Sequence, residues 1–159
     1  MNPSRGFLQQ IFLTFVLILL ASGASFAQSN PSEPLRVVLK GHDPVAYFTV
    51  GRPVKGVPEF KYDWDGERYL FANAGNRDKF AANPERYAPQ FGGYCTGSMS
   101  RGARNEGHPE AWVIVDGRLY VFGAPDSATA MKNKEDAEKD LGAFRVKVAA
   151  AAKNWGEKK

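Results

Sequence analysis

Alternating and continuous apolar stretches predict two β-hairpins in this chain. Residues 60–64 alternate apolar and polar side chains, and residues 68–71 return after an Asp-Gly pair. Residues 112–115 and 119–122 are apolar stretches separated by a second Asp-Gly pair. Asp-Gly is a favoured two-residue turn, so each pair of stretches predicts two antiparallel strands. The second hairpin is apolar throughout, which predicts burial on both of its faces.

Helical signals accompany the hairpins. Asn73 is a candidate N-cap for a helix over residues 74–82, which the following Asn-Pro pair ends. Residues 84–87 indicate one more helical turn, and residues 125–139 are charged and compatible with a helix. Residues 141–155 carry large apolar side chains at roughly helical spacing, so they predict a helical C-terminal segment.

The remaining segments are short or rich in turn residues. Residues 35–39 favour a first short strand, and Asp43 is expected to cap a helical turn over residues 44–48. Residues 49–58 and 89–107 contain several glycines, which predicts loops. The sequence therefore predicts an α+β fold, a small single domain with two β-hairpins, a central helix and a C-terminal helical segment.

The first 27 residues have the three parts of a secretory signal peptide. Arg5 is their only charged residue, residues 11–21 are almost wholly apolar, and Ser25 and Ala27 precede a cleavage site after Ala27. The apolar stretch is about half of the roughly 20 residues that a membrane span needs. We therefore expect a periplasmic or secreted protein with no stable membrane anchor after cleavage.

Cleavage would leave 132 of the 159 residues, enough for one domain with its own core. We expect a flexible leader over residues 28–34 and a domain over residues 35–156, with a core at 41–88 and an extension at 89–156. The formal net charge is +4, and Arg5 contributes one of these charges. So mild an excess does not indicate nucleic-acid binding. A periplasmic protein remains a candidate partner. The sequence does not indicate the oligomeric state.

The chain has a single cysteine, Cys95. In an oxidising compartment a lone cysteine has no partner for an internal disulfide. Four roles therefore stay open for Cys95: a buried and inert side chain, a metal ligand, a reactive thiol, or a bond to another chain.

An ordered set of residues in this chain resembles the YHS domain. The set comprises Asp43-Pro44-Val45, the hairpin residues Tyr62, Gly66, Tyr69 and Phe71, and the closing residues Phe80, Asn83-Pro84-Glu85 and Tyr87. The likeness continues through residues 87–95, 112–120 and 154–155, an arrangement similar to secreted bacterial proteins with a single YHS domain, some of them labelled selenoproteins. The resemblance implies a binding protein, with metal, copper above all, as the ligand class.

The metal expectation of this family depends on cysteines that the chain lacks. In copper-transporting ATPases the YHS pattern reads D-P-V-C and then F-C-x-x-x-C, which places thiols at Ala46, Ala72 and Asn76 of this chain. An alanine methyl group cannot bind a metal, and an asparagine amide is a poor ligand for copper(I). The cofactor is therefore left unknown, with copper or another transition metal as the candidate.

Cys95, His108 and Met99 are the metal ligands that the sequence predicts. Met99 would share a face with Cys95 if residues 96–100 form a helical turn, and His108 follows after a Gly-rich link. A set of cysteine, methionine and histidine suits copper. His42 is not included, because the group that the chain resembles more often carries tyrosine there.

Thiol redox chemistry at Cys95 is a second hypothesis. Gly92 and Gly93 would let the backbone approach the sulfur, and amide N–H groups around it would favour the thiolate. Arg101 and Arg104 lie nearby in the sequence. Because the chain has no second cysteine, such a reaction needs an external partner thiol.

A third hypothesis is a non-catalytic module that binds a ligand or a partner. Four aromatic residues would line its apolar pocket, although such residues at strand positions are more often core. They are Tyr47, Phe91, Tyr94 and Trp112. Across the three hypotheses we expect binding rather than catalysis, with metal as the leading ligand class. The expected structural residues are Asp43, Gly92 and Gly93.

Overall fold

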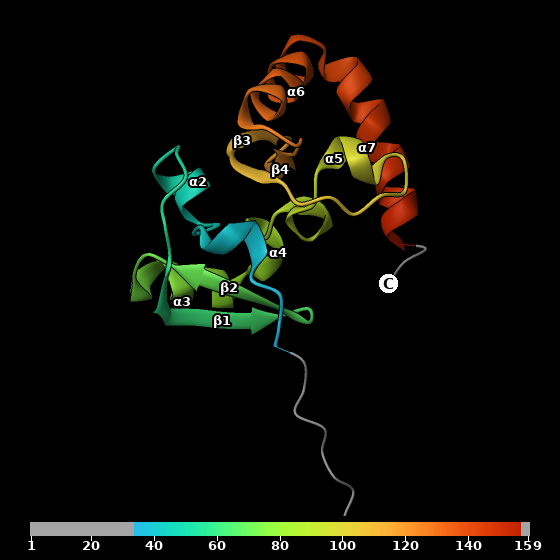
Figure 1. Cartoon of the computed structure of the whole chain (residues 1–159). Helices are drawn as coiled ribbons and strands as arrows, with labels where there is room; N and C mark the ends of the chain where they lie inside the picture. Colours follow the sequence, from blue (N-terminus) through green and yellow to red (C-terminus); the bar gives the residue numbers. More distant parts are fainter. Residues whose placement is uncertain (1–33, 157–159) are drawn as a thin grey trace, which may run out of the picture. The chain divides into compact units, whose positions relative to one another are not determined.

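Both predicted hairpins are present in the structure, a computed structural model that describes residues 34–156 (Figure 1). Strand β1 (Val57–Trp64) pairs antiparallel with β2 (Glu67–Phe71), and β3 (His108–Val115) pairs antiparallel with β4 (Arg118–Phe122). Each hairpin forms its own two-stranded sheet. Together with the helices the hairpins make the α+β fold. The predicted signal peptide and residues 28–33 of the predicted leader lie outside the described residues.

The Asp-Gly turns form as predicted. Asp65 and Asp116 have φ values of 53° and 52°, and the glycines that follow them are also in the left-handed region. Two successive positive φ values are typical of the hairpin turn whose twist matches that of the strands. β1 and β3 begin earlier than predicted. Val57 and His108 already pair with the partner strand, and a shift in register separates each of them from the regularly paired residues that follow.

The predicted helices are also present. α3 (Ala74–Ala82) begins at Asn73, whose side chain accepts a hydrogen bond from the Asn76 N–H, as the N-cap prediction requires. The other predicted helical segments correspond to α4 (Pro84–Tyr87), α6 (Ser127–Lys139) and α7 (Leu141–Gly156). Within residues 34–156, no helix is long and apolar enough to cross a membrane.

The predicted strand over residues 35–39 is wrong. Val37 makes only an isolated bridge to Arg68, and residues Val38–Gly41 form a 3₁₀ helix, η1. Leu39 and Lys40 have φ values of 54° and 50°, and two successive left-handed residues end the extended backbone that a strand needs.

The Gly-rich segment after α4 is more ordered than a loop. It contains a 3₁₀ helix, η2 (Gln90–Gly93), and a helical turn, α5 (Thr96–Met99). Earlier in the chain, α2 (Ala46–Thr49) forms the helical turn that was predicted after Asp43. Short helical turns therefore replace much of the irregular structure that the glycines indicate.

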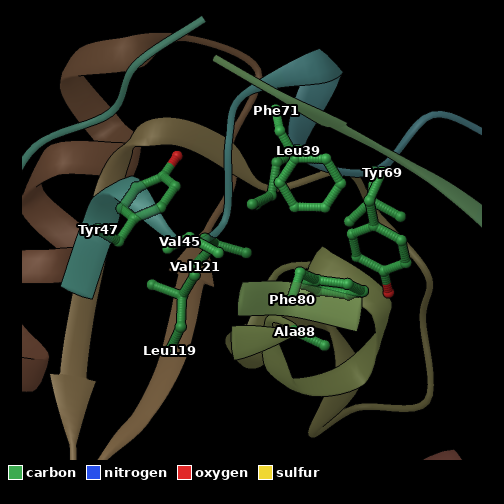
Figure 2. Close-up of a cluster of buried hydrophobic side chains, with 10 residues drawn as sticks. Leu39, Val45, Tyr47, Tyr69, Phe71, Phe80, Ala88, Leu119 and Val121 are labelled. Carbon is green, nitrogen blue, oxygen red and sulfur yellow. The ribbon is translucent and has the colours of Figure 1, made fainter. Parts of the chain in front are cut away.

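One core cluster surrounds Phe80 of α3 (Figure 2). The centroid of its ring lies 4.6 Å from that of Tyr69 and 5.2 Å from that of Phe71, both on β2. Leu119 and Val121 of β4 belong to the same cluster, although they lie far along the chain. The first hairpin and the second are therefore packed into one core.

A second core cluster lies on the other face of β4. Tyr120 and Phe122 contact Phe144 of α7, with ring centroids 5.2 Å and 5.7 Å apart. The apolar residues of β4 therefore alternate between two cores, and the predicted burial of both faces is confirmed for β4. It is not confirmed for β3, where Ile114 is 37% exposed.

Replacement of Phe80 by alanine tests the first cluster. Phe80 is fully buried among aromatic rings, so Phe80→Ala is expected to lower the free energy of unfolding by about 3–5 kcal/mol. Urea unfolding followed by circular dichroism measures the loss. Val146→Ala is the control, because Val146 is 70% exposed, and its effect should stay within about 0.5 kcal/mol. Equal effects of the two variants would contradict the assignment of the core.

Candidate functional site

A cavity of about 120 Å³ lies where α5, α6, α7 and the end of β4 meet. The thiol-bearing residue Cys95 lines it, and we call it the Cys95 cavity. Its lining residues are Cys95, Thr96, Gly97, Arg101, Phe122, Gly123, Asn133, Asp136, Ala137, Asp140, Ala143, Phe144 and Lys147. The cavity therefore combines the chain's only thiol with polar and charged side chains from two helices.

Backbone pairing with β4 fixes the position of Cys95. Cys95 makes a parallel bridge to Val121, and its N–H donates to the Asn105 carbonyl oxygen at 2.8 Å. The next residue, Thr96, donates its hydroxyl to the Val121 carbonyl oxygen at 3.3 Å. The Cys95 sulfur lies 3.5 Å from the carbonyl oxygen of Gly123, and the residue is only 2% exposed.

Two cations line the cavity without a partner among residues 34–156. The side chains of Arg101 and Lys147 make no ion pair or hydrogen bond within that part of the chain. A Cβ atom at Gly97 would lie 3.8 Å from the Cys95 sulfur and 3.9 Å from an Arg101 Nη atom. The thiol and the guanidinium therefore face the same small region beside Gly97.

The two carboxylates of the cavity are engaged with other groups. Asp136 forms an ion pair with Lys132 at 3.3 Å. Asp140 accepts a hydrogen bond from the Ala143 N–H at 2.9 Å, at the start of α7. Both carboxylates already have partners, so Arg101 and Lys147 are the charged groups of the cavity that are left to bind a ligand.

Of the three predicted metal ligands, only Cys95 lines this cavity. The helical turn after Cys95 is present, and the Met99 N–H donates to the Cys95 carbonyl oxygen at 2.9 Å. Met99 itself is fully buried in the second core cluster, and His108 begins β3 opposite Phe122. Within the described part of the chain, no three His, Cys, Asp or Glu side chains lie close enough to hold a metal ion.

The four predicted pocket aromatics lie in two pairs. Tyr47 and Trp112 pack edge to face, with ring centroids 5.1 Å apart, and the Tyr47 hydroxyl donates to a backbone carbonyl oxygen. Phe91 and Tyr94 each contact Trp155 instead. Trp112 lines one surface groove and Phe91 lines another.

Arg36 positions the loop that precedes the cavity. Its guanidinium donates to Glu67 at 2.6 Å, to Glu106 at 2.8 Å and to the Gly92 carbonyl oxygen. It also lies 4.2 Å from the ring centroid of Tyr94, a cation–π contact. This single side chain therefore joins the first hairpin to the loop that carries the thiol.

The predicted glycines allow a close approach between backbone segments. Gly93 has a φ of 77°, and a Cβ atom there would lie 3.1 Å from the Val38 side chain. The N–H groups of Tyr94 and Cys95 donate to backbone carbonyl oxygens, which leaves neither for the sulfur. A side chain at Gly93 would therefore be strained and crowded, and these two amides do not form the expected nest around the thiol.

Sequence reasoning missed most of the cavity. Asn133, Asp136 and Lys147 lie on α6 and α7, and nothing in their local sequence relates them to Cys95. Only the apolar spacing of α7 indicated that its face would pack on the core near Phe144. Arg101, which was singled out for its nearness to Cys95 in the sequence, does line the cavity.

The fold around Phe80 defines a small domain of a capped turn, an aromatic hairpin and a short helix. Residues 45–91 match the model of the YHS domain family, so the chain contains a YHS domain. The matched segment ends before Cys95, and the cavity therefore lies outside it. Comparisons with curated proteins and with solved structures found no match to this chain.

The two histidines occupy different hydrogen-bond settings. His42 Nδ1 donates to the Leu39 carbonyl oxygen at 2.9 Å, whereas His108 Nδ1 accepts from the Glu110 N–H at 3.3 Å. Burial lowers the pKa of His42 below 6.5, and the positive charges of Lys55 and His108 act in the same direction. The Leu39 carbonyl oxygen and Glu110 oppose this shift only in part.

His42 should make the stability of the fold depend on pH. Below pH 6.5 the unfolded chain takes up a proton more readily than the folded chain, since the folded pKa is lower. The free energy of unfolding should therefore fall as the pH drops from 6.5 to the folded pKa of His42. His42→Asn is expected to remove this slope in urea unfolding, and His108→Asn to retain it. An unchanged slope in His42→Asn would refute the prediction.

Proposed function

We propose that this protein is a periplasmic YHS-domain binding protein whose ligand site is the Cys95 cavity. One observation supports the proposal. The only thiol of the chain lines a cavity together with Arg101 and Lys147, two cations that have no partner among residues 34–156. Export to the periplasm rests on the signal-peptide pattern of residues 1–27.

The size of the cavity indicates a small ligand. Its volume is about 120 Å³, and an apolar cavity of roughly 150 Å³ holds benzene in another protein. A ligand of about half a dozen non-hydrogen atoms matches this volume. The burial of Cys95, which is 2% exposed, favours such a ligand over the cysteine of a partner protein, since a mixed disulfide between proteins needs an accessible sulfur.

The two cations of the cavity, unpaired within residues 34–156, favour an anionic ligand. Arg101 and Lys147 are free to pair with a ligand, whereas Asp136 and Asp140 already have partners. Guanidinium and ammonium groups form charge-assisted hydrogen bonds with carboxylates and other oxyanions. The proposed ligand is therefore a small anion that contacts the Cys95 thiol, and the role is binding rather than catalysis.

Thiol reagents of opposite charge test this proposal. The Cys95 thiolate attacks the outer sulfur of a methanethiosulfonate, a mixed disulfide forms, and methanesulfinate leaves. For each reagent, the rate of reaction with Cys95 is divided by the rate of its reaction with free 2-mercaptoethanol. We expect this normalised rate to be higher for the anionic sulfonatoethyl reagent than for the cationic trimethylammonioethyl reagent. Arg101→Ala and Lys147→Ala should each lower the anion-to-cation ratio roughly 10-fold.

Lys153→Ala is the matched control, because Lys153 is an exposed cation of α7 that does not line the cavity. This variant should leave the ratio unchanged. A wild-type ratio of one, or an equal effect of all three variants, would count against an anion site at Cys95.

Copper(I) binding is a second candidate function. The YHS domain is a module for which metal binding is expected, and the helical turn Thr96–Met99 puts a thioether residue one turn after the thiol. Thiolate and thioether sulfur are ligands that copper(I) prefers. The burial of Met99 in the second core cluster means that its sulfur would have to turn toward the cavity.

A copper(I) titration separates the two candidates. The protein is titrated under reducing conditions against a competing chelator, beside Cys95→Ser and Met99→Leu. Stoichiometric binding that both substitutions weaken is the result expected of a copper site. Binding no stronger than that of Cys95→Ser would remove copper and leave the anion proposal to the thiol-reagent rates.

A further inference from the structure

The Asp43 carboxylate is a fully buried polar centre two residues before the segment that matches the YHS family. Its Oδ1 accepts hydrogen bonds from the N–H groups of Val45 and Ala46, at 2.9 and 3.3 Å. Its Oδ2 accepts from the Ala72 N–H at 2.9 Å and from the Asn76 side-chain amide at 2.7 Å. Asp43 accepts from the first N–H groups of the turn, as a capping residue does, although the helix begins at Ala46 and not at Pro44 as expected. The two further donors are Ala72, directly after β2, and Asn76 of α3.

The three positions that the family pattern reserves for thiols meet at this carboxylate. Ala46, Ala72 and Asn76 are separated by up to 30 positions in the chain, yet each places a backbone or side-chain N–H on Asp43. Groups that share hydrogen bonds with one carboxylate lie within a few ångströms of it. The structure therefore brings together positions that the sequence only suggested were related.

The residues present do not fit a metal at this centre. Two of the three positions carry methyl groups, and Asn76 directs its N–H group, a donor, toward the carboxylate. Each Asp43 oxygen already accepts two hydrogen bonds. Within residues 34–156, no buried side-chain nitrogen or oxygen lacks a partner. A metal ion would have to break these bonds and would find one carboxylate as its only anionic ligand.

We infer that Asp43 and its four hydrogen-bond donors form a metal-free cross-link at the place where cysteine-bearing YHS domains would hold a metal. Thiols at positions 46, 72 and 76 would create a metal site there. In this chain the hydrogen bonds connect the turn before α2 to Ala72, directly after β2, and to Asn76 of α3. A buried carboxylate with four donors can perform that structural task without an ion. The inference does not depend on the Cys95 cavity.

Cobalt(II) titration tests the inference in a background that lacks the native thiol. The test protein carries Ala46→Cys, Ala72→Cys, Asn76→Cys and Cys95→Ser, and is kept reduced. Thiolate-to-cobalt absorption reports ligation, and thermal unfolding reports stabilisation by the bound ion. The first control carries Cys95→Ser alone. The second control carries Ala46→Cys, Ala72→Cys and Cys95→Ser but retains Asn76.

The three-thiol variant should bind one cobalt ion at least about 100-fold more tightly than the control that retains Asn76. Its unfolding temperature should rise with cobalt concentration. Cys95→Ser alone should show no cobalt–sulfur absorption and the same unfolding temperature in cobalt and in chelator.

Two results would overturn the inference. One is cobalt binding by Cys95→Ser that Asp43→Asn abolishes, because the native centre would then hold metal. The other is a three-thiol variant that binds no more tightly than its control. If that variant is unfolded without metal, folding on addition of cobalt supports the inference, and failure to fold with cobalt contradicts it.

Discussion

The register of β4 is the constraint on which the rest of this domain depends. Leu119 and Val121 face the cluster around Phe80, while Tyr120 and Phe122 face the cluster around Phe144. All four are buried, so a slip of one residue would exchange the side chains of two cores at once. Small and large apolar residues alternate along β4, and such an exchange would put aromatic rings where aliphatic side chains now fit.

The candidate site takes its geometry from the same strand. The bridge between Cys95 and Val121 and the contact from the Cys95 sulfur to the Gly123 carbonyl oxygen both depend on where β4 ends. Arg36 acts from the opposite side, since it holds the preceding loop to the first hairpin through Glu67 and Glu106. Cys95 is thus placed by backbone hydrogen bonds and by one guanidinium, with little freedom of its own.

Local signals explain what the sequence predicted well. The Asp-Gly turns, the Asn73 cap and the Asp43 cap each depend on a few neighbouring residues, and the structure has all of them. The predicted strand over residues 35–39 was wrong because Leu39 and Lys40 have a left-handed backbone, which nothing in an apolar stretch indicates. The Cys95 cavity and the Ala72 and Asn76 bonds to Asp43 arise from tertiary packing, which periodicity and turn residues do not report.

Because β4 contributes side chains to both cores, the segment that matches the family is shorter than the segment that builds the core around Phe80. The segment that matches the YHS family ends at residue 91, but the core around Phe80 takes Leu119 and Val121 from beyond it. A fragment that ends at residue 91 would lack Leu119 and Val121 and would leave that side of the core open to water. The burial of one such aliphatic side chain contributes about 1.5–3 kcal/mol. The segment that matches the YHS family therefore completes its core only together with β4, which belongs to the C-terminal extension.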